Sequence, residues 1–351
     1  MSIKIFDGHN DSLLRLERNG DHVPFLFGDG GHVDLPRALE GGMAGGFFAC
    51  YVPRSLREPD PDEITVHYDH GGYETTLAAP LDPDYARAVT VSMARKLFQL
   101  EEDSEGALVV VRSTDDLVRC LEDDVFATIL HFEGAEAIDP DLDVLEDFYA
   151  DGLRSLGIVW SRPNLFGHGV QFRFPSSPDT GPGLTRAGRQ LVRTCNDLGI
   201  MVDVSHLTAA GFWDVANLSR MPIVATHSNA HALCPSSRNL TDEMLAAIRD
   251  SNGVAGISFC VCDVRPDGED DTDVSIDDLL NHVEYIAEQI GIDHVAFGSD
   301  FDGAMVPDSV GDAAGYSRLL EGLEERGFSE EEMAKVAHGN WVRVLSETWY
   351  D

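Results

Sequence analysis

The stretch Ile200-Met-Val-Asp-Val-Ser-His206 contains the pattern that decides the fold. Its apolar, β-branched run over 200–204 predicts a buried strand, and a histidine follows where that strand should end. A helix start precedes it, where Thr185 opens Arg-Ala-Gly-Arg-Gln-Leu-Val, and another follows it, where Thr208 opens Ala-Ala-Gly-Phe-Trp. Both threonines suit the N-cap position of a helix. The stretch is therefore a strand between two helices, as in a parallel α/β sheet.

The same unit recurs along the chain. We expect buried strands over 3–7, 46–52, 127–132, 155–160, 200–204, 223–226, 254–259 and 295–298. About eight strands joined by helices indicate a (β/α)8 TIM barrel, here one domain over 1–351. An open doubly wound sheet is less favoured, because neither GxGxxG nor GxxxxGK[ST] is present. Residues 60–83 are expected to form an insertion in an early loop, and 108–112 an extra strand outside the barrel.

The composition excludes several classes of protein. The 351 residues are 43% hydrophobic, and 25 Lys and Arg against 62 Asp and Glu give a formal charge of -37. Such a charge repels nucleic acid and anionic lipid. No signal peptide or run of about 18 apolar residues is found, and the cysteines lack CxxC spacing. We therefore expect a cytoplasmic protein that binds neither nucleic acid nor membranes.

Residue types that bind metals stand where several of the predicted strands end. In a TIM barrel, the carboxyl ends of the strands meet at one mouth, where the loops build the site. The segments are Asp7-Gly-His9-Asn-Asp11, His131-Phe-Glu133, Asp203-Val-Ser-His206, Ala225-Thr-His227 and Gly298-Ser-Asp300-Phe-Asp302. If the first strand stays extended, its alternation places Asp7, His9 and Asp11 on one face.

Imidazole nitrogen and carboxylate oxygen are the ligands of zinc and similar divalent ions. The histidines and carboxylates exceed what one catalytic ion needs, so two metals sharing a carboxylate fit better. Each residue alone has a simpler interpretation. Glu133 could interact with a helix dipole, Asp300 or Asp302 could cap a loop, Asp7 could form a turn, and His131 could be a packed core residue. Their joint occurrence at five strand ends favours a metal site.

The pattern resembles the membrane dipeptidase family, also called renal dipeptidases, which are zinc-dependent amidohydrolase-like barrels. The matching segments run in order over nearly the whole chain. They are Asp7-Gly-His-Asn-Asp11, Phe132-Glu-Gly134, Gly183-Leu-Thr-Arg-Ala-Gly-Arg189, Asp203-Val-Ser-His206, Thr226-His-Ser228, Ser237-Arg-Asn239 and Gly298-Ser-Asp-Phe-Asp-Gly303.

The resemblance implies two zinc ions per chain. His9 and Asp11 would bind one ion, His206 and His227 the other, and Glu133 would bridge them. A hydroxide shared by the ions would be the nucleophile and Asp300 the acid/base. Arg238 would hold the substrate's free carboxylate, although a surface salt bridge is its simpler interpretation. The implied reaction is hydrolysis of a dipeptide, and a homodimer is a weaker expectation.

One segment departs from the family's pattern. After the fourth strand, peptidases of this family carry a histidine thought to assist the substrate's carbonyl, whereas this position falls here on Trp160 or Ser161. Arg162 or His168 could replace the lost donor, although His168 could equally be an ordinary residue of a glycine-rich turn. Alternatively, the substrate could be another small amide, a lactam or an ester. A metal-binding scaffold without turnover is a further alternative.

Overall fold

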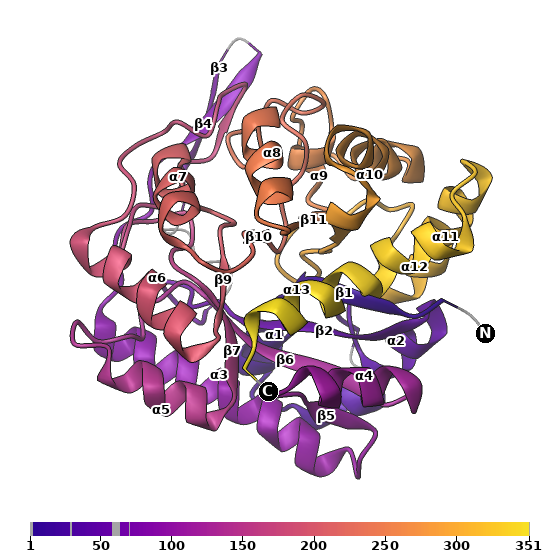
Figure 1. Cartoon of the computed structure of the whole chain (residues 1–351), viewed down its shortest axis with the longest axis horizontal. Coiled ribbons are helices and arrows are strands. Elements are labelled where there is room, and N and C mark those ends of the chain that lie inside the picture. The colour runs from indigo at the N-terminus through magenta and orange to yellow at the C-terminus, as the bar shows by residue number, and fades with distance from the viewer. Residues whose placement is uncertain (1–2, 29, 58–63, 70, 351) are drawn as a thin grey trace.

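The computed structural model describes residues 3–28, 30–57, 64–69 and 71–350. Its main sheet follows the order β1-β2-β6-β7-β9-β10-β11-β12, and the paired strands are parallel (Figure 1). These strands are β1 (Ile5–Asn10), β2 (Met43–Cys50), β6 (Phe126–Glu133), β7 (Leu153–Gly157), β9 (Met201–Asp203), β10 (Val224–Ala225), β11 (Val254–Ile257) and β12 (Val295–Phe297). The predicted TIM barrel is thereby confirmed.

Two backbone hydrogen bonds bring the first strand to the segment that follows the last. The Asp300 amide donates to the His9 carbonyl at 3.0 Å, and the Asp11 amide donates to the Phe301 carbonyl at 2.8 Å. These bonds lie at the carboxyl ends of β1 and β12. The barrel is therefore closed at the mouth where the predicted ligands stand.

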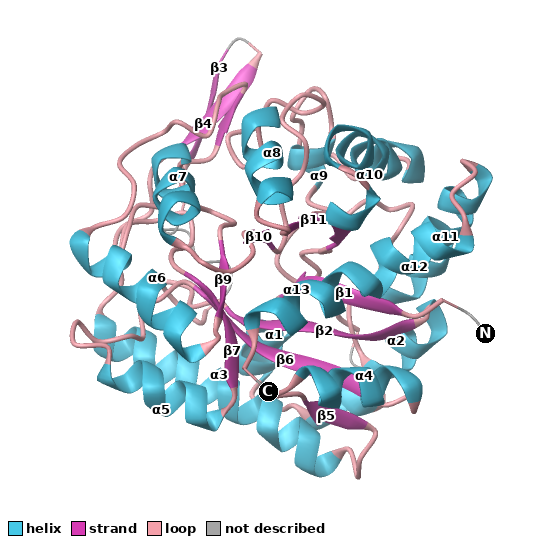
Figure 2. Ribbon diagram, in the orientation of Figure 1, coloured by secondary structure: helices cyan, strands magenta, loops and turns pink. Residues whose placement is uncertain are grey.

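Helices surround the strands (Figure 2). They are α1 (Ser12–Asn19), α2 (Leu35–Gly41), α3 (Pro83–Asp103), α4 (Thr114–Glu122), α5 (Asp143–Asp151), α6 (Arg186–Leu198), α7 (Ala209–Leu218), α8 (Asp242–Asp250), α9 (Val261–Val264), α10 (Ile276–Ile290), α11 (Tyr316–Glu325), α12 (Glu330–Ala334) and α13 (Asn340–Thr348). Shorter turns are η1 (Val23–Leu26), η2 (Ile292–His294), η3 (Ala313–Gly315) and η4 (Lys335–Gly339). The predicted caps are confirmed, since the Thr185 and Thr208 side chains accept hydrogen bonds from Gly188 and Gly211 amides.

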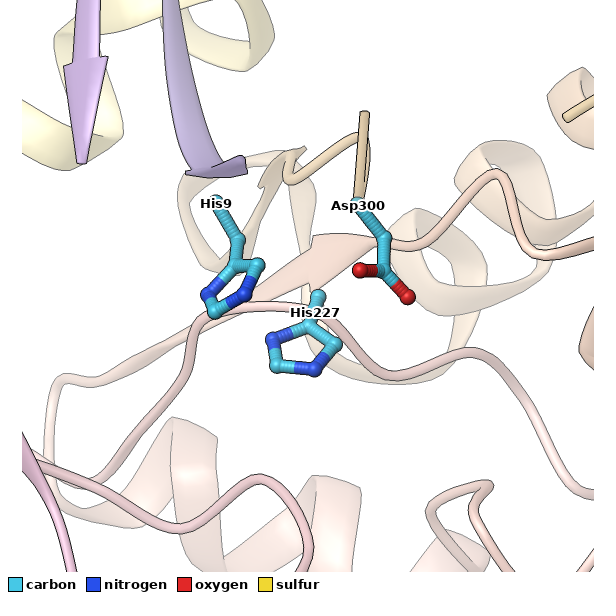
Figure 3. Close-up of side chains that lie close together, drawn as sticks. All are labelled: His9, His227 and Asp300. Atoms are coloured by element: carbon cyan, nitrogen blue, oxygen red, sulfur yellow. The ribbon is translucent and has the colours of Figure 1, made fainter. Parts of the chain in front are cut away.

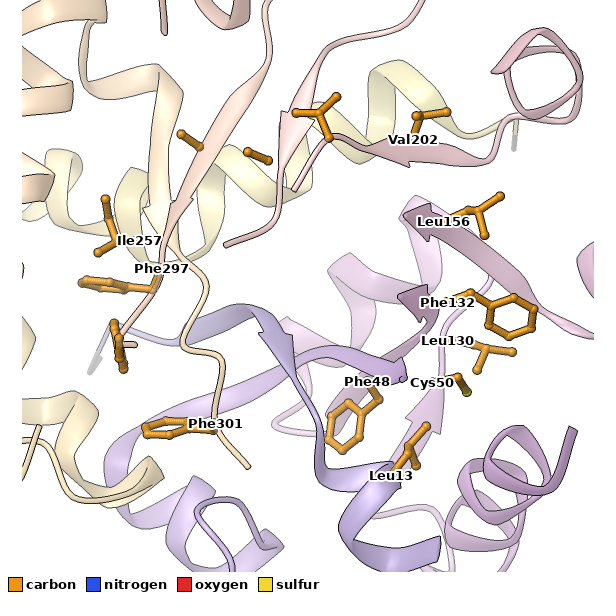
Figure 4. Close-up of a cluster of buried hydrophobic side chains, with 14 of the residues drawn as sticks. Leu13, Phe48, Cys50, Leu130, Phe132, Leu156, Val202, Ile257, Phe297 and Phe301 are labelled. Atoms are coloured by element: carbon orange, nitrogen blue, oxygen red, sulfur yellow. The ribbon is translucent and has the colours of Figure 1, made fainter. Parts of the chain in front are cut away.

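Buried side chains alternate between two faces along most of the barrel strands. Neighbouring residues separate into an interior cluster and an outer core beneath the helices. The interior set includes Phe6, Phe47, Ile129, Met201, Val224, Val254 and Ala296. The outer core includes Phe48, Leu130, Phe132, Leu156, Val202, Ile257 and Phe297 (Figure 4). Burial on both faces explains why these strands read as continuous apolar runs.

The first strand departs from the predicted alternation. It runs over Ile5–Asn10 rather than 3–7, with an irregular register against β2 between Asp7 and Asn10. Phe6 belongs to the interior cluster, whereas Asp7 bonds with Tyr316 of the outer core. The expectation that Asp7 shares a face with His9 is therefore wrong. The irregularity changes the alternation before His9, as a bulge does.

The glycine at position 8 is required by close packing. A Cβ there would lie 2.3 Å from the Trp341 ring and 2.7 Å from the Thr226 carbonyl oxygen. Trp341 is fully buried, belongs to α13 and donates from Nε1 to the Phe297 carbonyl at 3.1 Å. The last helix thus inserts an indole into the barrel interior beside Gly8.

The early insertion forms a hairpin in the described residues 64–69 and 71–83. Strands β3 (Val66–Asp69) and β4 (Gly72–Thr75) pair antiparallel, and β8 (Arg173–Phe174) extends this small sheet (Figure 1). Part of the predicted insertion, 60–63 and 70, lies outside the described residues. The extra strand is confirmed as β5 (Leu108–Val110), which pairs with β6 off the barrel path. Within the described ranges, no helix has the length and apolar character to cross a membrane.

Candidate metal centre

The five predicted metal ligands converge at the barrel mouth. His9 lies in β1, Asp11 follows that strand, and Glu133 ends β6. His206 and His227 follow β9 and β10. All five side chains are buried, although they come from positions more than 200 residues apart. The sequence-based expectation of a common centre therefore agrees with the geometry.

Glu133 belongs to both groups of donors. One group is His9, Asp11 and Glu133, and the other is Glu133, His206 and His227; within each, the ligand atoms lie within 4.8 Å of one another. The His9 Nε2 lies 3.4 Å from Asp11 Oδ2 and 3.8 Å from Glu133 Oε1. This arrangement offers two adjacent positions for cations with a shared carboxylate.

The second group is tightly gathered. His206 Nε2 lies 2.9 Å from Glu133 Oε1 and 2.9 Å from His227 Nε2. Burial lowers the pKa of both histidines well below the usual value, with positive neighbours adding to the effect: Arg238 for His206, and His9 for His227. Neutral imidazoles keep a lone pair, which metal coordination requires.

A hydrogen-bonded chain orients His227. The Thr226 hydroxyl donates to Asp203 Oδ2 at 2.7 Å and lies 2.9 Å from His227 Nδ1. Since the hydroxyl hydrogen points to Asp203, its oxygen accepts from the His227 Nδ1–H. We assign this tautomer from the hydrogen-bond network. It leaves the lone pair of His227 Nε2 directed at the centre, as in other histidine-metal sites with an outer carboxylate.

Ser161 supports the other histidine. Its hydroxyl lies 2.8 Å from His206 Nδ1, so Nε2 faces Glu133. His206 has a φ of 64°, in the left-handed region, and its carbonyl accepts from the Val170 amide at 2.7 Å. Such backbone strain in a non-glycine residue is common at functional sites. Ser161 and Asp203 lie in segments singled out from the sequence, but their contacts with the ligands were not predicted.

Buried polar atoms of His9 and Asp11, which lack hydrogen bonds across the described ranges, show that these two residues fit a divalent metal ion. Both ring nitrogens of His9, and Asp11 Oδ1, are buried without a hydrogen-bond partner among the described residues. A buried polar atom without a partner costs about 1–3 kcal/mol. Burial alone would lower the pKa of His9, but Glu133 and Asp11 outweigh it and raise that pKa to about 10. These carboxylates therefore favour positive charge at this position.

Asp300 faces this centre, and Asp302 does not. A ligand atom of Asp300 lies within 4.8 Å of those of His9 and His227, and the three side chains point toward one another (Figure 3). Burial raises the pKa of Asp300 to about 7. Asp302 instead accepts from the His32 amide at 2.7 Å and from Ser12 Oγ at 2.9 Å. The choice of Asp300 over Asp302 therefore agrees with the geometry.

Arg238 also lies at the centre. Its Nη2 is 3.3 Å from His206 Nε2 and donates to the His227 carbonyl at 3.2 Å. The residue is only 7% exposed, and no carboxylate of the described chain forms a salt bridge with it. The surface salt bridge considered from the sequence is therefore wrong. A buried guanidinium that forms no salt bridge among the described residues is suited to an anionic ligand.

Asp7 and His131, the other candidates for metal binding at these strand ends, have structural contacts instead. Asp7 accepts from the Ser299 amide at 2.8 Å, Ser299 Oγ at 2.9 Å and Tyr316 at 2.8 Å, so it is not a turn residue. It joins β1 to the segment after β12. His131 is fully buried, with Nδ1 2.7 Å from Ser155 Oγ, and packs edge-on to His9 with ring centroids 5.4 Å apart. His131 is thus a packed residue behind the ligands.

The fourth barrel strand, β7, ends at Gly157 rather than at the predicted residue 160. Trp160 therefore lies in the loop beside the centre. Its ring lies 5.8 Å from that of His206 and 5.0 Å from that of Tyr51, between centroids. Arg162 cannot replace a substrate donor without leaving its partners, because its Nε donates to Glu136 at 2.8 Å. His168 is partly exposed in the loop that follows.

A parallel barrel whose mouth gathers histidines and carboxylates is typical of metal-dependent enzymes. The family model described as "Membrane dipeptidase (Peptidase family M19)" matches residues 1–349. This chain belongs to that family of metallopeptidases, which hydrolyse peptide bonds and are generally zinc-dependent.

Solved structures of similar proteins agree with this assignment. A metallopeptidase from Rhodobacter sphaeroides, bound to a phosphinate mimic of the dipeptide L-Ala-D-Ala, has a TM-score of 0.94 and 46% identity. The similarity covers 99% of this chain and 100% of that one. A dipeptidase of family M19 has a TM-score of 0.93 and 47% identity over 99% of both chains. A Klebsiella pneumoniae protein encoded 5′ of pqqA is 47% identical over 253 residues, or 72% of this chain and 93% of its own.

Proposed function

We propose that this chain is a binuclear zinc dipeptidase. His9 and Asp11 would hold one ion, His206 and His227 the other, and Glu133 would bridge them. The observation that carries this proposal is the presence of Glu133 in both donor groups. Bound there, two divalent cations would generate a nucleophile from water at neutral pH and polarise the scissile carbonyl.

Asp300 is the proposed acid/base residue. It is oriented toward one histidine of each donor group. A carboxyl beside both donor groups can accept a proton from the nucleophile and release it to the leaving amine. In the proposed reaction it takes a proton as the nucleophile attacks and delivers that proton to the leaving amine.

Arg238 is the proposed binding residue for the substrate's terminal carboxylate. Its buried guanidinium can form a bidentate pair with that group. Because Nη2 lies 3.3 Å from His206 Nε2, the carboxylate would sit within one residue's reach of the scissile amide. This spacing supports dipeptides over longer peptides. The phosphinate mimic of L-Ala-D-Ala held by the Rhodobacter sphaeroides relative supports a D-residue on the carboxyl side.

Elemental analysis combined with an Asp300→Asn variant tests the proposal. The purified wild-type chain should carry about two equivalents of zinc. The variant should retain them and lose about 100- to 10,000-fold in turnover of a dipeptide, the range for removal of an acid/base group. A variant with wild-type turnover, or a chain saturated by a single ion, would contradict this mechanism.

A second candidate substrate class follows from Trp160. Trp160 or Ser161 occupies the position where the family's peptidases carry a histidine, and the loss of that histidine favours another small amide, a lactam or an ester. A panel of dipeptides, N-acyl amino acids and lactones separates the two classes. Hydrolysis confined to the last two groups would replace the dipeptidase proposal.

A further inference from the structure

A second group of metal-binding side chains lies beside the catalytic mouth. Cys260 and Cys262 follow β11, and Asp263 is the next residue, within α9. The two sulfur atoms lie 3.4 Å apart, and one ligand atom from each residue lies within 4.8 Å of the others. None of the three belongs to the donor groups that share Glu133.

The group of Cys260, Cys262 and Asp263 is accessible to solvent, and its backbone is held by hydrogen bonds. Both thiol residues are partly exposed, whereas Asp263 is 6% exposed. The Asp263 carbonyl accepts from Asn229 Nδ2 at 3.2 Å and Asn239 Nδ2 at 2.8 Å. The three side chains are therefore held together at a position that solvent can reach.

We propose that Cys260, Cys262 and Asp263 form a separate binding site for a thiophilic divalent cation such as Cd²⁺ or Zn²⁺. Two thiolates around a tetrahedral zinc, with bonds of about 2.3 Å, have their sulfurs about 3.8 Å apart. The observed separation needs only a small side-chain rotation to reach that value. Each S–H bond is replaced by a bond from sulfur to the metal, two protons leave to solvent, and no oxidant is required.

The thiol environment selects for such an ion. A ligand set of two sulfur atoms and one carboxylate favours cations with high affinity for sulfur. The site would therefore discriminate against Mg²⁺ and Ca²⁺, which prefer oxygen ligands.

The site is connected to the catalytic mouth. Asp263 Oδ1 accepts from Ser236 Oγ at 2.5 Å, and the Arg238 amide donates to the same hydroxyl at 3.3 Å. An ion that draws Asp263 toward the sulfurs would weaken this chain and shift Arg238. We expect a raised KM for dipeptides as a consequence. This effect on KM, unlike the binding of the ion, depends on the proposed role of Arg238.

Titration of the reduced, zinc-loaded enzyme with Cd²⁺ tests the proposal. We expect about one further equivalent to bind, with the ultraviolet charge-transfer band of thiolate–Cd²⁺ bonds. The variant C260S/C262S should lose the band. Its affinity for this equivalent of Cd²⁺ should fall by more than about 100-fold, which exceeds the loss expected when a residue that only hydrogen-bonds a ligand is removed. The matched control Cys120→Ser removes a distant buried thiol and should leave both unchanged.

Several outcomes would overturn the site. They are absence of the band in the wild type, its persistence in C260S/C262S, and a wild-type mass that shows a Cys260–Cys262 disulfide under reducing conditions. Cd²⁺ at the histidine–carboxylate centre gives no thiolate band, so this readout is independent of the dipeptidase proposal. An altered KM without the band would likewise count against the site.

Discussion

The two sides of the candidate metal centre are built differently. On the β9–β10 side, His206 Nδ1 lies against Ser161, and His227 Nδ1 lies against a threonine that donates to Asp203. On the β1 side, neither nitrogen of His9 has a hydrogen-bond partner among the described residues. The first side is oriented by the protein. The second is positioned by its backbone and by ring packing on His131.

The difference indicates where a bound ion contributes most to order. Outer hydrogen bonds fix a histidine's tautomer and ring orientation before a metal arrives. His9 lacks that support, so an ion would satisfy a nitrogen that is otherwise buried without a hydrogen bond in the described part of the chain. We therefore expect the β1 side to depend on the metal for its order and the β9–β10 side to depend on its hydroxyl groups.

The largest expected effect comes from the residue that both sides share. Glu133→Gln should lower kcat/KM for a dipeptide by about 1,000-fold or more, the upper range for loss of one electrostatic group in an active site. It should also lower zinc content, because the amide lacks the second anionic oxygen that a bridge needs. The exposed Glu146→Gln is the matched control. Unchanged zinc and activity in Glu133→Gln would show that no shared ligand exists.

Removal of metal by a chelator tests the asymmetry directly. An ion present at about 1,000 times its dissociation constant stabilises the fold by about 4 kcal/mol, so the melting temperature should fall on chelation. Amide hydrogen exchange should rise more at Asp11 and Asp300, which join β1 to the last strand, than at Thr226. Equal increases on both sides would contradict the comparison.

Acid should weaken the attachment of α10 to the segments that follow β10 and β11, through His282 of that helix. Its Nδ1 accepts from the Ala230 amide at 3.1 Å and its Nε2 lies 3.0 Å from the Val264 carbonyl. Burial lowers the pKa of His282 to about 4, below the value of 6.5 expected when unfolded. The neutral ring therefore contributes stability above pH 6.5 that is lost progressively as pH falls to about 4, up to about 3 kcal/mol.

Chemical denaturation of the chelated protein over this pH range measures the effect without metal loss. His282→Gln should reduce the dependence of the free energy of unfolding on pH, while the buried His206 and His227 keep the rest of it. His67→Gln changes an exposed histidine and should leave the slope as it is. A slope in His282→Gln equal to that of the wild type would assign the acid sensitivity to other groups.

The smallest effects are expected from the hydroxyls behind the ligands. Thr226→Val and Ser161→Ala should each lower zinc affinity by about 10- to 100-fold, the usual cost of losing an outer partner. Competition with a coloured chelator measures this, and Thr194→Val on α6 is the control. Undiminished affinity in both variants would remove the distinction between the two sides.

The order of the chain predicted the fold and the place of the centre. Apolar runs alternating with capped helices indicated the barrel, and parallel strands bring their carboxyl ends to one mouth, where ligand-type residues gather. That argument left Asp7, His131 and Asp302 as candidates beside the five ligands, and the choice among them, with the roles of Asp300 and Arg238, came from the family resemblance. Strand limits were less predictable, because the polar residues that end a strand also occur within β1.

Only the tertiary structure decided the contacts across the barrel. Asp7 was expected on the face of His9, but the irregular register of β1 turns it to Ser299 and Tyr316. The tautomer of His227 depends on Asp203, and the indole of Trp341 fills the barrel interior beside Gly8. These contacts depend on lateral distances between strands remote in sequence. Local pattern determines which segments form strands and helices and in what order, whereas packing between strands determines which atoms finally meet.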